Sequence, residues 1–559
     1  MPADFCLETW DKLEIYFRDL EQRPLSSVAD LQKWLKDWSE LDAVTSEDFA
    51  WRYIRMTCDT ESAALTDAYL FFVEKIEPFT EPYTNTFNKK LISSPFLGQL
   101  DRSLFGIYLR GVENDLALFR EENIPLFTRL ASMEREYAAI AAAMSVSYSG
   151  KEYTLQQAAV FLKSSDRAVR EKVYGLVQNR RMEDEGRTDQ LYDELIALRQ
   201  QVATQTGFLN FRDYMFRAMG RFDYSAKDCF DFHEAIHKQV IPVVDILDRE
   251  RMKLMHLDQL KPWDMEAEPD GKEPLHPFDN GADLLDKAIQ CFAEIRPYYG
   301  ECLEVMKKMK RLDLDSRMGK APGGYNYPLN ETGVPFIFMN SAGLHRDLVT
   351  MVHEGGHALH AFLTNALELE AFKNYPSEVA ELASMSMELI SMEHWDVFFK
   401  DEDDLRRAKK EQLEKILRIL PWISVIDKFQ HWVYENYRHT HQERVSKWTE
   451  MISAFGSTVI DWTGLEKYRM NSWHAQLHLF DAPFYYIEYG FAQLGALAVW
   501  RNYKQNRERT LNQYETALKL GYTRSIPEIY AAAGIRFDFS EGYVKEILDF
   551  VKQELKNLL

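Results

Sequence analysis

The stretch "VTMVHEGGHALHAF", residues 349–362, combines the period of an amphipathic helix with two adjacent glycines. His353 and His357 stand four residues apart, so a helix would project both imidazoles from one face. Two imidazoles at this spacing can bind one zinc ion, and Glu354 follows the first histidine as a candidate general base. The pattern H-E-x-x-H therefore predicts a metal site on a helix. The alternative is that the two histidines only form hydrogen bonds in the core.

The presence of two adjacent glycines, Gly355 and Gly356, in the middle of a predicted helix requires an explanation. A glycine in a helix interior costs about 1 kcal/mol relative to alanine. We predict that Gly355 lies on the packing side of the helix, where a missing side chain lets a neighbouring element approach closely. Contacts of this kind would offset the cost in helix propensity. A conformational role for the pair is the alternative.

The composition is that of a globular protein with a large core. The chain has 559 residues, of which 46% are hydrophobic and 28% charged. Its formal net charge of −21 opposes a nucleic acid or an anionic membrane as the main partner, so small substrates are favoured. Residues 1–17 contain early acids and no long apolar run, and we therefore expect neither a signal peptide nor a membrane span.

The cysteines favour a cytoplasmic protein. They are five in number and lack the C-x-x-C spacing of a metal or redox motif, so we expect mostly buried thiols rather than a disulfide framework. The positions are Cys6, Cys58, Cys229, Cys291 and Cys302. The sequence leaves the oligomeric state open.

Helical periodicity dominates the chain, for example over 115–144 and 416–437, and predicts a mainly α fold. The polar, proline-rich stretch 261–281 cannot continue a helix and is expected to form a long surface loop. We divide the chain into an N-terminal helical subdomain, 1–200, and a catalytic subdomain, 201–559.

One β signal stands before the motif helix. Residues 323–340 contain two short aromatic and β-branched runs separated by "LNETG", which predicts a β-hairpin. The second strand, 334–340, leads toward the motif helix. Its exposed edge is one candidate for pairing with an extended peptide, and an ordinary core strand is the alternative.

A catalytic zinc site needs a third protein ligand and one open position. The stretch 375–390 predicts a second helix with Ser377 as its N-cap, and it brings three glutamates near one face. These are Glu378, Glu381 and Glu388. Spacing alone does not choose among them, because an acid in a first helical turn also complements the helix dipole.

The segment "HEGGHALH" (353–360) followed by "AELASMSME" (380–388) resembles the thimet oligopeptidase and oligoendopeptidase F family of zinc peptidases. The resemblance implies Glu381 as the third ligand, with 23 residues between it and His357. Glu388 matches a family acid, and Glu378 matches an acid that would hold a ligating histidine by its other N–H. It also implies a large helical body with a thermolysin-like zincin core and a deep channel for short peptides.

A second cluster of polar rings lies in 474–490. Taken alone, it is typical of aromatic packing. "HLFDAPFYYIEY" (478–489) is, however, similar to the family's histidine-and-tyrosine stretch, which contacts substrate and stabilises the tetrahedral intermediate. The resemblance favours His478, Tyr486 and Tyr489 for this role, and the choice between Tyr485 and Tyr486 stays open.

Together these features predict a zinc oligoendopeptidase that cleaves internal bonds of short unstructured peptides, with one zinc ion activating water and Glu354 accepting its proton. Two alternatives remain. A zinc aminopeptidase would usually carry a G-x-M-E-N-type element, which this sequence lacks. A peptide-binding or scaffolding protein would need a fourth ligand to close the metal site, for which His360 or Glu378 is available.

Overall fold

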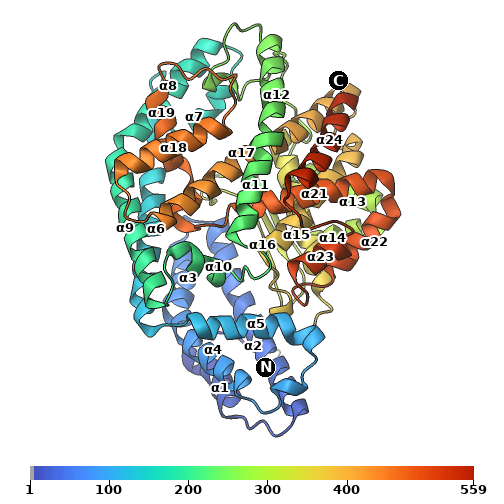
Figure 1. The fold of residues 1–559 in the computed structure, drawn as a ribbon. Coiled ribbons are helices and arrows are strands. Elements are labelled where there is room, and N and C mark those ends of the chain that lie inside the picture. The colour runs from blue at the N-terminus through green and yellow to red at the C-terminus, as the bar shows by residue number, and fades with distance from the viewer. Residues whose placement is uncertain (1–4, 559) are drawn as a thin grey trace. The chain divides into compact units, whose positions relative to one another are not determined.

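The computed structural model describes residues 5–558 and confirms the predicted mainly α fold (Figure 1). Within that range no helix is both long and apolar enough to cross a membrane. The five cysteines form no disulfide there. The helices, in chain order, are α1 (Trp10–Gln22), α2 (Val28–Cys58), α3 (Ala63–Lys75), α4 (Glu77–Ile92), α5 (Arg102–Leu118), α6 (Ile124–Ala142), α7 (Leu155–Ala159), α8 (Arg167–Glu183), α9 (Glu185–Gln205), α10 (Phe211–Ala218), α11 (Ala226–Gln239), α12 (Ile241–Leu254), α13 (Gly281–Ile295), α14 (Pro297–Lys308), α15 (His345–Thr364), α16 (Ser377–Ser391), α17 (Glu402–Glu435), α18 (His441–Phe455), α19 (Glu466–Met470), α20 (Leu477–Asp481), α21 (Ile487–Gln505), α22 (Arg507–Leu518), α23 (Ile526–Ala532) and α24 (Glu541–Asn557).

The chain forms two compact units, each built from three segments. Unit 1 comprises Met1–Ala117, Leu275–Lys409 and Ala492–Phe537, and unit 2 comprises Leu118–Pro274, Lys410–Phe491 and Asp538–Leu559. One boundary between the units, at Pro274 and Leu275, lies in the predicted proline-rich stretch 261–281. The division into functional subdomains 1–200 and 201–559 stays a prediction.

The described strands form two small sheets. One is the antiparallel pair β1 (Ser145–Tyr148) and β2 (Lys151–Thr154) in unit 2. The other lies in unit 1 and has the order β3-β5-β4, formed by β3 (Leu312–Asp315), β4 (Tyr325–Tyr327) and β5 (Phe336–Ser341). The predicted hairpin is confirmed, because β4 and β5 pair antiparallel.

The exposed edge predicted for the second hairpin strand is wrong. β5 pairs with β4 on one side and in parallel with β3 on the other, and most of its residues are buried. The hydrophobic run 336–339 therefore forms a core strand, as the alternative interpretation held. In this sheet only β3 and β4 leave an edge that an extended chain could join.

Helices α15 and α16 carry the predicted metal ligands, and local sequence fixes where both begin. Asp347 accepts hydrogen bonds from the backbone N–H groups of Ala342 at 2.7 Å and Leu344 at 3.1 Å, which satisfies donors at the start of α15. Pro376 is the N-cap of α16, and Ser377 is its first helical residue. The prediction of Ser377 as the N-cap is therefore wrong by one position, since the extended backbone of Pro376 already ends the loop.

The two glycines of α15 allow close packing on two sides. A Cβ atom at Gly356 would lie 2.7 Å from Ser384 Cα and 3.0 Å from Met387 Cβ, both on α16. A Cβ atom at Gly355 would lie 2.6 Å from the ring of Phe292, on α13. The predicted close approach at Gly355 is confirmed. A side chain is less tolerable at Gly356 than at Gly355, because the atom nearest to a Cβ at Gly356 is the backbone atom Ser384 Cα.

We expect Gly356→Ala to lower the stability of the protein by about 1–3 kcal/mol, because the added methyl group overlaps the α16 backbone and forces the helices apart. The control is Gly111→Ala on α5, where the added Cβ meets nothing within 4 Å. That change should leave stability unaltered or raise it by up to about 1 kcal/mol. Apparent melting temperatures measure both effects, and equal shifts in the two variants would contradict the packing argument.

Candidate active site

The structure brings His353, His357 and Glu381 together. His353 Nε2 lies 3.4 Å from Glu381 Oε2, and His357 Nε2 lies 4.0 Å from the same oxygen. One donor atom from each of the three side chains lies within 4.8 Å of the others. The two rings come from successive turns of α15, and the carboxylate comes from α16, as the helical spacing predicts.

This donor set fits one zinc ion. Zinc bonds of about 2.0–2.2 Å in a tetrahedral site place neighbouring ligand atoms about 3.3–3.6 Å apart. The His353–Glu381 separation of 3.4 Å falls within this range, and the His357–Glu381 separation of 4.0 Å exceeds it by a few tenths of an ångström. Two imidazoles and one carboxylate are also the ligand types of the catalytic zinc sites that keep one position open.

The orientation of the His353 ring is fixed by Glu388. Its Nδ1–H donates a hydrogen bond to Glu388 Oε1 at 2.6 Å, so Nε2 faces His357 and Glu381. A carboxylate on the far nitrogen is the usual partner of a metal-binding histidine and raises its basicity. Glu388 makes this contact with His353, whereas the same role for Glu378 stays a prediction.

The buried acids create a field that favours positive charge at this place. Burial alone disfavours a charged His353, but the hydrogen bond with Glu388 and the charge of Glu381 raise its pKa to about 9. The pKa of His357 lies well below its ordinary value because the ring is largely desolvated and close to His353. Burial raises the pKa of Glu381. The site therefore combines a neutral imidazole with carboxylates that gain from a neighbouring cation.

Glu354 is buried on the same helix as the two imidazoles. Burial raises the pKa of its carboxyl to about 7, against the lowering effect of His353. Its backbone carbonyl accepts a hydrogen bond of 3.4 Å from the Asn326 side chain on β4, which ties the helix to the sheet. A carboxyl with a pKa near 7 can both accept and release a proton near neutral pH.

His360 is packed away from this group. Its ring is fully buried and stacks on Tyr375 with 3.6 Å between the ring centroids. Burial lowers the pKa of His360 to about 3, so the ring is neutral. This arrangement removes His360 as a closing fourth ligand.

The second set of predicted residues gathers in unit 2. The His478 ring centroid lies 4.8 Å from that of Tyr486 and 6.2 Å from that of Tyr489, and the two tyrosine rings are 5.5 Å apart. Tyr485 lies farther from His478, at 6.1 Å. Of the two adjacent tyrosines, Tyr486 is therefore the closer neighbour of His478. The roles of these rings beside a substrate stay a prediction.

Two residues that sequence reasoning missed fix the tautomer of His478. The Trp422 indole N–H donates to Gln476 Oε1 at 2.9 Å, which orients the amide, and the Gln476 NH₂ group then donates to His478 Nδ1 at 2.7 Å. Because Nδ1 accepts, the neutral ring carries its hydrogen on Nε2. Burial lowers the pKa of His478 and favours this neutral form. No local motif marks Gln476 or Trp422, since the link depends on packing across 54 residues of chain.

A mainly α chain with an H-E-x-x-H helix packed against a glutamate-bearing helix has the residue pattern of a zinc-peptidase site. Sequence comparison independently gives the class of peptidases. The family model described as "Peptidase family M3" matches residues 160–548 of the chain. A second family model, described as "Peptidase M3 N-terminal domain", matches residues 4–119. The chain belongs to peptidase family M3, which confirms the resemblance predicted from its motifs.

Individual relatives agree with this assignment. An oligoendopeptidase F homolog of Lactococcus lactis subsp. lactis is 23% identical over 337 residues, which cover 58% of this chain and 53% of that protein. The chain thus matches about half the length of this curated relative. The solved structure of PZ peptidase A with inhibitor 2 has a TM-score of 0.90 and 27% identity, with 99% of each chain covered. Oligoendopeptidase-F from Enterococcus faecium, at 14% identity, shares the fold with a TM-score of 0.67 over 98% of this chain and 97% of that chain.

We expect Glu388→Ala to weaken zinc binding at this site about 10–100-fold, because His353 loses the carboxylate that orients its ring. Competition with a chromophoric chelator measures the affinity. Glu368→Ala is the matched control, since Glu368 is half exposed and paired with Lys36 at the surface. An unchanged zinc affinity in Glu388→Ala would show that the 2.6 Å contact does not support the metal site.

Proposed function

We propose that the chain is a zinc-dependent oligoendopeptidase that hydrolyses internal bonds of short unstructured peptides. The convergence of His353, His357 and Glu381 at two packed helices carries the proposal. These three side chains would hold the zinc ion. Zinc in such a site supplies Lewis-acid polarisation of a carbonyl and makes a water molecule more acidic at neutral pH.

Glu354 is proposed as the general base. Its carboxyl stands on the ligand-bearing helix, and burial brings its pKa to about 7. In the ionised form it can take a proton from the attacking water, and in the protonated form it can deliver that proton to the leaving amine. The same buried carboxyl therefore serves both halves of peptide hydrolysis.

His478 and Tyr486 are proposed as donors to the oxyanion of the tetrahedral intermediate. The tautomer set by Gln476 leaves an Nε2–H on His478 that is available to donate. Tyr486 carries a phenol beside it, and Tyr489 packs against both rings. Donors fixed before the reaction begins stabilise developing negative charge at little cost in reorganisation.

Glu354→Gln should keep its zinc and lose at least about 10²-fold in kcat, because the amide cannot accept the proton. Quenched fluorescent peptides measure turnover, and elemental analysis measures zinc. His353→Ala is the companion variant and should contain one zinc ion fewer per chain than the parent protein. Full turnover by Glu354→Gln would exclude Glu354 as the base.

Tyr486→Phe should lower kcat about 10²–10³-fold with little change in KM, as expected when an oxyanion donor is removed. Tyr485→Phe is the matched control, since it removes the neighbouring phenol from a ring that lies farther from His478. Steady-state kinetics on one peptide compare the two. If Tyr485→Phe lost the greater activity, the assignment would pass to Tyr485.

Peptides of graded length separate this function from its alternatives. An endopeptidase should cleave N-acetylated peptides, whereas an aminopeptidase requires the free amine. We expect o-phenanthroline to abolish cleavage and added zinc to restore it, since the ion is essential to the chemistry. A protein that cleaved no peptide of any length, with or without the chelator, would be a binding or scaffolding protein. Cytoplasmic location and the absence of nucleic-acid and membrane partners stay predictions.

A further inference from the structure

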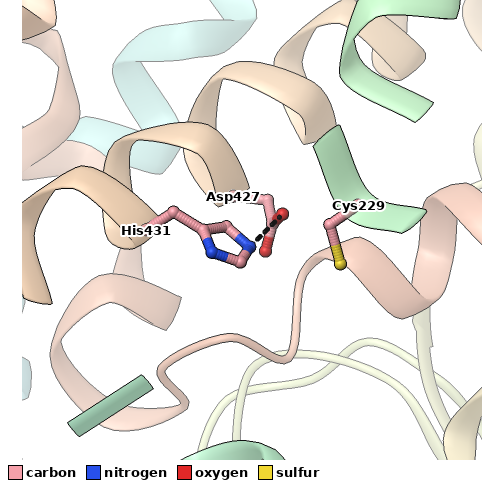
Figure 2. A group of neighbouring side chains, drawn as sticks. All are labelled: Cys229, Asp427 and His431. Atoms are coloured by element: carbon pink, nitrogen blue, oxygen red, sulfur yellow. Dashed lines mark ion pairs between the residues drawn. The ribbon is translucent and has the colours of Figure 1, made fainter. Parts of the chain in front are cut away.

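A second cluster of metal-binding side chains lies in unit 2, apart from the α15 residues described above. Cys229, Asp427 and His431 each offer one donor atom, and these atoms lie within 4.8 Å of one another. In Figure 2, Asp427 and His431 extend from α17, and Cys229 extends from α11. The cluster thus joins two helices that are far apart in the sequence.

Each helix contributes a pair of residues at the spacing that suits a shared ligand. Asp427 and His431 are four residues apart on α17, and Cys229 and His233 are four residues apart on α11. Residues at this spacing lie on one face of a helix. His233 joins the cluster through its Nε2, which lies 2.8 Å from Asp427 Oδ2. Two helical pairs therefore meet at one carboxylate.

The cluster is shielded from solvent. Cys229 and Asp427 are 0% exposed, and His233 and His431 are 1% exposed. Aromatic rings line His431, with Phe230 and Phe484 at centroid distances of 4.7 and 5.4 Å. A substrate has no access to such a place, so a ligand here has a structural effect and no catalytic one.

Several polar atoms of the cluster lack the hydrogen bonds that burial demands. Within residues 5–558, His431 Nδ1 and Asp427 Oδ1 have no hydrogen-bond partner. His431 Nε2 lies 3.2 Å from Asp427 Oδ2, the carboxylate oxygen that His233 also contacts. A buried polar atom without a partner loses its hydration without compensation, which destabilises the folded state. The cluster therefore calls for a group that engages an imidazole nitrogen and a carboxylate oxygen together.

A divalent cation meets this need better than a water molecule. A water molecule would find only a weak partner in a cysteine sulfur. Zinc binds thiolate, imidazole and carboxylate. Its two positive charges would cancel one thiolate and one carboxylate, and a neutral group is the form that burial tolerates.

We infer that unit 2 holds a second, buried zinc site, with Cys229, Asp427 and His431 as its three protein ligands, a water molecule as the fourth ligand, and His233 as the hydrogen-bond donor that orients Asp427. The bound ion links α11 to α17 and stabilises this unit. The site shares no residue with the metal ligands, the general base or the oxyanion donors proposed above.

Cobalt tests the inference, because a cobalt–thiolate bond gives a charge-transfer band in the near ultraviolet. The full chain with His353→Ala and His357→Ala is produced in cobalt-supplemented minimal medium, so that the ion is present while the buried site forms. We expect one cobalt ion per chain and the thiolate band. A chain without cobalt, or with cobalt but no thiolate band, would overturn the inference.

Further substitutions in the same background identify the thiol. Cys229→Ser should abolish the band, and His431→Ala should abolish cobalt binding. Cys302→Ser is the matched control and should retain the band, since Cys302 is likewise buried but lies in unit 1. A band that survives Cys229→Ser or disappears in Cys302→Ser would overturn the assignment. X-ray absorption by the bound cobalt should show one sulfur ligand, and this measurement needs no change at the site itself.

Discussion

The candidate active site depends on how closely two helix backbones approach each other at Gly356. The nearest α16 atom is Ser384 Cα, and a side chain at Gly356 would overlap it. α15 carries the two imidazoles, and α16 carries Glu381 and Glu388. The 2.6 Å and 3.4 Å contacts of His353 with these acids need the two helices in direct contact. Gly356 lowers the helix propensity of α15, but it allows the close helix contact that sets the geometry of the site.

Close packing also determines the electrostatics. Glu354, Glu381 and Glu388 are buried around one imidazole pair, an arrangement that self-repulsion and desolvation oppose. The opposite pKa shifts of the two rings follow from this environment, since His353 touches the acids directly whereas His357 faces burial and a neighbouring ring. A neighbouring positive charge would stabilise such a concentration of acid, and the proposed metal ion would supply it.

The sequence predicted what short-range periodicity can encode. The H-E-x-x-H helix, the hairpin and the candidate carboxylates followed from spacing within single elements. Contacts between different helices and strands could not be predicted from the sequence in the same way. β3 is four residues long and pairs in parallel with β5, a later strand of the chain, so no local sequence pattern predicted it. The Glu388 contact and the Gln476–His478 pair likewise depend on which helix faces come together.

The same helical spacing underlies both proposed cation sites, and ligand charge and solvent exposure distinguish them. Two neutral imidazoles and one carboxylate leave a divalent cation with one net positive charge, which favours the negative charge that develops in hydrolysis. The side chains of His353 and His357 are 21% and 18% exposed, so this group can be reached. In the Cys229 cluster, the additional thiolate would cancel the net charge of the bound cation. Full burial of the cluster prevents a substrate from reaching it. Residue spacing on a helix can therefore indicate a cation site, but the ligand charges and the surrounding packing decide whether that site performs chemistry or holds the fold together.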